Sequence, residues 1–175
     1  GISRTFQNLA LWPRMTVDEN VMTGKHTQGN QNFFSAMNRF GLKQEEKDLR
    51  DSAYAALEIL DLLEHAEKPC DVLPFGTMKR IELARALVNN PKLLLLDEPA
   101  TGLTHSEVAE LSELIISVRE QFNLTILLVE HHMGMVMGMS EKVVVLDFGS
   151  KIAEGTPSEI QNNPLVVSAY LGAPK

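Results

Sequence analysis

The chain has 175 residues, of which 44% are hydrophobic and 22% are charged, and its formal net charge is −7. This length suits one ordinary globular domain, and the excess of acidic side chains argues against a surface built to bind nucleic acid. No apolar run approaches the roughly 20 residues that span a membrane, and a single cysteine, Cys70, excludes an internal disulfide framework.

The first half of the chain predicts one short strand and then mainly helices. Thr16 and Glu19 have the spacing of a capping box, in which each side chain bonds a backbone amide of the first helical turn, so a helix is expected to begin there and to end near Gly24. The other expectations for this half are a strand over residues 3–8, a polar loop over 25–32, an amphipathic helix over 43–63 and a helix over 76–89.

Beyond residue 90 short apolar runs alternate with helical patterns. The apolar runs are residues 92–96, 124–129 and 142–146, and helices are expected over 106–121 and 132–139. Such alternation predicts a parallel β-sheet that is buried on both faces. The remaining expectations are a hairpin turn over 147–150, a short strand over 151–154 and two small helices that start at Pro157 and Pro164.

The stretch LLLLDEPATGL ends its apolar run on two acids, Asp97 and Glu98. A carboxylate at the end of a buried strand needs a cation, a proton or a metal, because burying it unpaired is costly. His131 follows the next apolar run, and the carboxyl ends of neighbouring parallel strands meet at one edge of a sheet. An aspartate that holds Mg²⁺, a glutamate that activates water and a histidine that contacts phosphate would form a site for phosphoryl transfer. The alternative is structural: Asp97 caps the next segment, Glu98 is solvated and His131 lies in the core.

The segment LPFGT, residues 73–77, stands where a helix is expected to begin. Free amides and the positive end of the helix dipole make such a place able to bind an anion. An ordinary junction between a loop and a helix is the competing interpretation.

Taken together, these motifs resemble those of the nucleotide-binding subunits of ABC transporters, over essentially the whole chain. The matching features, in order, are Gln7 after a strand, LPFGTMKR with ARAL, LLLLDEP and ILLVEHH. The resemblance implies an α/β fold: part of the P-loop NTPase fold, with a parallel sheet flanked by helices and an α-helical signature subdomain. It further implies three regions: 1–15 as the glutamine-loop end of a catalytic lobe, 16–90 as the signature subdomain and 91–175 as the α/β core.

The same resemblance implies roles for individual residues. Glu98 matches the catalytic base and His131 the switch histidine, while Asp97 and Gln7 match positions that contact the metal. The signature motif would contact the γ-phosphate of ATP held by a second ATPase subunit. The implied nucleotide contacts are Gln7, Leu73, Pro74, Phe75, Gly76, Thr77, Asp97, Gly102, Leu103 and Thr104.

Three segments resemble the ATPase subunits of branched-chain amino acid importers: FQNLALWPRMTVDENVMTGKH, the signature written with LP, and KIAEGTPSEIQNNPLVVSAYLG. This implies ATP and Mg²⁺ as cofactors, a second ATPase subunit and transmembrane permease subunits as partners, and a peripheral position at the cytoplasmic face of the inner membrane. Relatives that serve amide or urea uptake or lipopolysaccharide export share much of the pattern. A non-catalytic, truncated ABC module that acts by interaction alone is a further alternative.

The chain also departs from the family pattern. The 175 residues contain no GxxxxGK[ST] phosphate loop, which in the family precedes the glutamine loop. We therefore expect a segment of a longer chain or a truncated relative, with weak or no ATP binding by these residues alone. Thr77 stands where the family usually has Gln or Glu, and Thr104 stands in place of an aspartate.

Overall fold

The computed structural model describes residues 1–25 and 39–171, which form two compact units, Gly1–Val129 and Glu130–Lys175. The loop expected over 25–32 lies almost wholly outside the described residues. None of the described helices is both long and apolar enough to cross a membrane.

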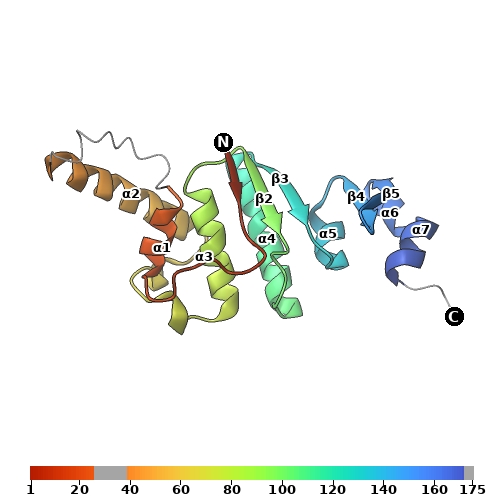
Figure 1. Ribbon diagram of the computed structural model, residues 1–175, viewed down its shortest axis with the longest axis horizontal. Helices are drawn as coiled ribbons and strands as arrows, with labels where there is room; N and C mark the ends of the chain where they lie inside the picture. Colours follow the sequence, from red (N-terminus) through yellow and green to blue (C-terminus); the bar gives the residue numbers. More distant parts are fainter. Residues whose placement is uncertain (26–38, 172–175) are drawn as a thin grey trace. The chain divides into compact units, whose positions relative to one another are not determined.

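The first unit contains a parallel sheet of three strands in the order β1-β2-β3 (Figure 1). The strands are β1 (Ile2–Arg4), β2 (Leu93–Asp97) and β3 (Thr125–Val129), and the parallel pairing confirms that the two apolar runs are neighbours. β1 is shorter than the strand predicted over residues 3–8. Its last sheet bond runs from the Thr5 amide to the Leu95 carbonyl, and the Phe6 amide, which points away from β2, donates to the side chain of Glu82.

One face of this sheet is covered and the other is open. Leu94 and Leu96 are fully buried, and Leu96 lines a small cavity together with side chains of α3 (Phe75–Leu87) and α4 (His105–Phe122). On the opposite face Ile2 is 71% exposed, Leu127 58% and Val129 55%. The prediction of burial on both faces is therefore wrong for this sheet, because helices of the described unit pack on one side only.

The helices of the first unit begin and end through local chemistry. The capping box of Thr16 and Glu19 is formed as predicted and opens α1 (Val17–Thr23), with Gly24 as the C-cap. The long helix α2 (Arg39–Ile59) ends four residues before the predicted boundary of 63, because the chain turns at Asp61, where φ is +54°. Short 3₁₀ turns follow at η2 (Leu63–His65) and η3 (Cys70–Val72).

Asn20 joins α1 to η3 inside the first unit. Its buried amide group donates to the carbonyls of Trp12 (3.0 Å) and Met15 (3.3 Å) and to Sγ of Cys70 (3.2 Å). A buried amide must be hydrogen-bonded, so these contacts fix the course of residues 12–20 beside η3. The Cys70 thiol is 1% exposed as a result of this packing.

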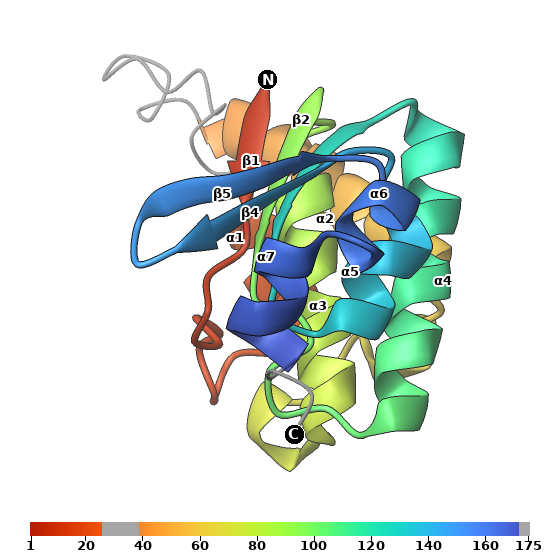
Figure 2. The same cartoon turned by 90° about the vertical axis from the view of Figure 1, so that its right-hand side faces the viewer.

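The second unit is built on the antiparallel hairpin of β4 (Val143–Asp147) and β5 (Ser150–Gly155) (Figure 2). The predicted turn is confirmed: Phe148 and Gly149 both have positive φ, as two-residue hairpin loops require. The third apolar run thus pairs with β5 in a separate two-stranded sheet, and the prediction that it joins the parallel sheet is wrong for the described residues. The helices of this unit are α5 (Met133–Met139), α6 (Pro157–Gln161), α7 (Pro164–Val166) and a π-helical turn, η4 (Val167–Leu171).

Candidate functional site

The end of β2 brings Glu98 and Gln7 together, although 91 residues separate them in sequence. The Glu98 amide donates to the Val129 carbonyl (2.8 Å), and a φ of +46° then turns the chain out of the sheet. The carboxylate accepts from Gln7 Nε2 at 2.9 Å and from Thr101 Oγ1 at 3.1 Å, both through Oε2. Because Oε2 accepts from two donors, the orientation of this carboxylate at the carboxyl end of β2 is fixed.

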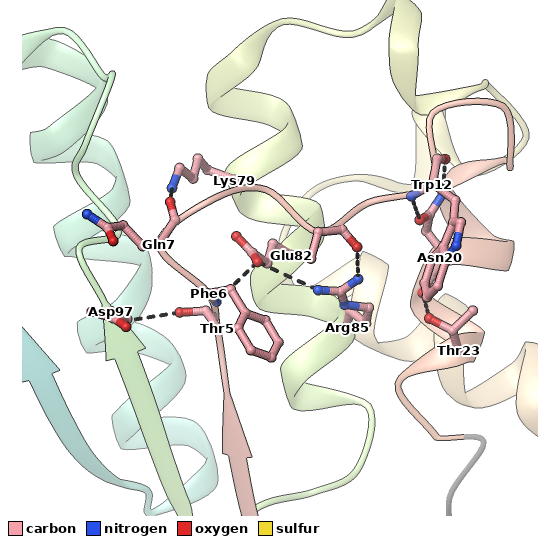
Figure 3. Close-up of polar contacts among 11 residues, drawn as sticks. Thr5, Phe6, Gln7, Trp12, Asn20, Thr23, Lys79, Glu82, Arg85 and Asp97 are labelled. Carbon is pink, nitrogen blue, oxygen red and sulfur yellow. Dashed lines mark hydrogen bonds and ion pairs between the residues drawn. The ribbon is translucent and has the colours of Figure 1, made fainter.

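Asp97 has a cation as its partner. Arg4 of β1 contacts Oδ2 of Asp97 at 2.8 Å, and the Asp97 side chain is 27% exposed. The Asp97 amide donates to Thr5 Oγ1 at 3.4 Å (Figure 3). Sequence reasoning missed Arg4. The contact between Arg4 and Asp97 depends on the strand register, which sets Arg4 beside Leu95.

Asp97 fits a Mg²⁺ site that is completed by a substrate. Among the described residues there is no group of three or more His, Cys, Asp or Glu side chains arranged to hold a metal. Protein sites for Mg²⁺ commonly supply only one or two carboxylates, with substrate phosphates and water as the other ligands. Asp97 supplies one such carboxylate at the carboxyl end of β2, where ligands of α/β proteins bind.

The signature segment and the segment that follows Glu98 pack against each other within the chain. Gly102 has a φ of +85°, and a Cβ built there would lie 2.8 Å from Cε1 of Phe75. A Cβ built on Gly76 would lie 2.8 Å from Oε1 of Glu107. At Gly102 the close approach and the positive φ both favour glycine, whereas at Gly76 the close atom belongs to the flexible Glu107 side chain.

Thr104 is the N-cap of α4. Its side chain accepts from the Glu107 amide (3.4 Å), and Glu107 Oε2 accepts from the Thr104 amide (2.8 Å). The Thr104 amide and the Thr104 hydroxyl, which donates to Glu107 Oε2 at 2.7 Å, lower the pKa of Glu107. Thr104 thus has a structural role as an N-cap; an aspartate could accept from the Glu107 amide but could not donate to the Glu107 carboxylate.

The first turn of α3 borders an open groove. Pro74 is the N-cap and has no side-chain capping bond, and Leu73, directly before it, is half-buried. The groove is lined by Pro74, Gly76, Thr77, Arg80, Leu103, Glu107, Glu110, Leu111, Glu113, Leu114 and Ser117.

The second unit holds the two histidines of the EHH motif. The His131 amide donates to Glu130 Oε2 (2.8 Å), and the His131 side chain is 68% exposed. His132, to which the sequence assigned no role, caps α5 by accepting from the Met135 amide at 3.3 Å.

Three side chains of α3, whose function sequence reasoning missed, contact the main chain of the segment that contains Gln7 (Figure 3). Glu82 accepts from the Phe6 amide (3.2 Å), Lys79 donates to the Gln7 carbonyl (3.4 Å) and Arg85 donates to the Ala10 carbonyl. Burial raises the pKa of Glu82, against the lowering effects of the Phe6 amide, Lys79 and Arg85. Burial lowers the pKa of Arg85.

Two family models match the chain. The first, described as ABC transporter, matches residues 1–101. The second, described as branched-chain amino acid ATP-binding cassette transporter, matches residues 150–175.

Similar proteins of known identity cover nearly the whole chain. The LivG branched-chain amino acid transport ATP-binding protein of Salmonella typhimurium is 43% identical over 98% of this chain and 68% of its own length. The branched-chain amino acid transport ATP-binding protein BraF of Pseudomonas aeruginosa is 39% identical over the same shares. The ADP conformation of MJ1267, an ATP-binding cassette of an ABC transporter, superposes with a TM-score of 0.80 at 27% identity, covering 99% of this chain and 69% of that one. A nucleotide-free ATP-binding cassette gives a TM-score of 0.76 at 32% identity, over the same shares of each chain.

Proposed function

The chain belongs to the ABC transporter ATP-binding family, and from that premise we propose that it acts in the ATP-hydrolysing subunit of an importer for branched-chain amino acids. The names of its relatives LivG and BraF support this substrate, as does the match of residues 150–175 to the branched-chain amino acid model. These similarities favour the importer over the lipopolysaccharide-export and amide-uptake alternatives, and over a module that acts by interaction alone.

The hydrogen bond from Gln7 to Glu98 is the observation that carries the proposed chemistry. Glu98 is the base in this proposal: its carboxylate takes a proton from the water that attacks the γ-phosphate of ATP. Gln7 and Thr101 hold the carboxylate in one orientation, and such preorganisation lowers the barrier because no reorganisation is needed during the reaction.

Asp97 and Gln7 would hold Mg²⁺, which when bound neutralises charge on the phosphate oxygens. His131 would contact the γ-phosphate. Residues 73–77 and 102–104 would face the nucleotide of a second ATPase subunit. Permease subunits in the membrane would be moved through the segment around Gln7, which places the protein at the cytoplasmic face of the membrane. These 175 residues by themselves would bind ATP weakly, since they contain no phosphate loop.

Replacing Glu98 by Gln tests the proposed role of the base. The variant keeps the shape of the side chain but cannot accept a proton, so the turnover number for ATP should fall by about 100-fold to 10,000-fold in the intact ATPase subunit with its permease partners. ATP affinity, measured by equilibrium titration, should stay within about twofold, because the loss affects the transition state only. Glu58→Gln on the exposed side of α2 is the control. Native turnover in Glu98→Gln would exclude Glu98 as the base.

A further inference from the structure

Residues 5–12 connect β1 to α1 and pass alongside α3 (Figure 3). We refer to Lys79, Glu82 and Arg85 as the α3 polar cluster. Their spacing of three residues places them on one side of the helix, and each contacts the main chain of the connecting segment. The contacts fall on Phe6, Gln7 and Ala10, so the main chain is held on both sides of Gln7.

The cluster is buried, which is unusual for three charged residues. Glu82 is 2% exposed and Lys79 is 5% exposed, while the Arg85 side chain is 12% exposed and lies 3.6 Å from Glu82. Buried ion pairs often contribute little net stability, because desolvation offsets their attraction, and apolar side chains can replace them without loss. Stability alone therefore does not account for a carboxylate at position 82.

The Glu82 carboxylate has a directional role that an apolar side chain cannot perform. It accepts the amide of Phe6, which points away from β2 because successive amides of an extended chain face opposite edges. This hydrogen bond ties the main chain to α3 directly before Gln7, whose side-chain amide reaches Glu98. Arg85 holds both Glu82 and the Ala10 carbonyl, and it lies over the ring of Trp12 at 5.9 Å.

We propose that Glu82 is a positioning residue for ATP hydrolysis: it fixes the Phe6 amide and, with Lys79 and Arg85, holds the main chain that presents Gln7 to Glu98. This inference rests on the proposed function, in which Gln7 and Glu98 act at the attacking water. It predicts that Glu82 acts through Gln7 and not through overall stability.

Amide hydrogen exchange of the 175-residue chain tests the positioning directly. Loss of one hydrogen bond in Glu82→Leu should speed exchange of the Phe6 amide by about tenfold. Glu82→Gln keeps an acceptor oxygen and should give a smaller increase. Asp18→Asn is the matched control, because Asp18 is also a buried acid (3% exposed) but contacts Thr16, Glu19 and Arg50 instead of the segment. It should leave the Phe6 amide unchanged even if it lowers the melting temperature.

A double-mutant cycle with Gln7 tests whether the effect reaches the reaction. In the intact ATPase with its permease partners, Glu82→Leu should lower kcat by about tenfold with little change in KM, since displacing a catalytic group by a fraction of an ångström has costs of this order. Glu82→Gln should recover part of the rate. In the Gln7→Ala background the Glu82→Leu change should cause no further loss, because a residue that acts through another is not additive with it.

The two hypotheses fail in different ways. Native exchange of the Phe6 amide in Glu82→Leu, or full additivity of Glu82→Leu with Gln7→Ala, would overturn the positioning role. Native turnover in Gln7→Ala would instead contradict the proposed function of Gln7, whatever the exchange rates show.

Discussion

At the scale of single residues, adjacent acids acquire different surroundings. Asp97 pairs with the guanidinium of Arg4, whereas Glu98, one residue later, turns out of the sheet and accepts from two uncharged donors. The positive φ of Glu98 separates the two side chains. Left-handed backbone at a non-glycine residue is strained, and such strain often occurs at functional sites.

Glu82 should make the stability of the chain depend on pH. Its pKa in the folded state is raised above 4.5 by burial, so the contribution to stability is complete below pH 4.5 and is lost as the pH rises through the folded-state pKa. Glu82→Gln removes this titration. Urea unfolding at several pH values should therefore show that the difference in free energy of unfolding, Gln variant minus native, grows from pH 4.5 upward and then levels off. A difference that does not vary with pH would show that Glu82 has an unshifted pKa.

Gly102→Ala should destabilise the first unit by about 2 to 3 kcal/mol, because a methyl group there combines an unfavourable φ with the close approach of Phe75. Gly149→Ala is the matched control: its φ is +82°, but a Cβ would meet nothing within 4 Å, so only the backbone cost of about 1 kcal/mol is expected. Thermal unfolding of both variants measures the difference. Equal losses would mean that Phe75 moves aside freely.

At the scale of elements, the capping box of α1 and the hairpin could be predicted from sequence because they are local. Thr16 and Glu19 satisfy each other's amides within one turn, and at the hairpin turn Gly149 readily accepts a positive φ. The hydrogen bond that the Phe6 amide makes to Glu82 could not be predicted, since the two residues are 76 positions apart in sequence. The partner of Asp97 depends likewise on strand register. The lengths of the apolar runs also do not indicate which strands become neighbours in a sheet.

Thr104 offers a test of the helix cap itself. Thr104→Ala should lower stability by about 1 kcal/mol, because the first amides of α4 lose their side-chain acceptor. Thr104→Asp keeps an acceptor for the Glu107 amide but cannot donate to the Glu107 carboxylate as the threonine hydroxyl does at 2.7 Å, so it should recover only part of the loss. Denaturant titration distinguishes the two. If aspartate were as damaging as alanine, the threonine would have a role other than capping.

At the scale of the whole molecule, the parallel sheet has one open apolar face. Ile2, Leu127 and Val129 share that face by strand register and are all more than half exposed. Single exposed apolar side chains are ordinary, but a contiguous group of them favours association. The sequence indicated that these strands are apolar, but it did not show which of their faces would be covered.

The double variant Leu127→Thr with Val129→Thr should therefore reduce self-association of the 175-residue chain. Threonine keeps β propensity, so the strand should persist while apolar area is removed. Light scattering over a concentration series measures the mass, and Thr125→Val, which adds apolar area to the same face, should act in the opposite direction. Unchanged masses in both variants would place the association surface elsewhere.

The packing of η3 against Asn20 makes the rate of thiol modification a measure of how often this part of the chain opens. The single thiol, Cys70, is almost fully buried, and burial, with a smaller contribution from Asp71, raises its pKa to about 11. At neutral pH the thiolate that alkylating reagents attack is nearly absent from the folded chain. Each modified molecule therefore records one opening of the contact between α1 and η3, and the labelling rate reports how often this part of the molecule opens while the rest remains folded.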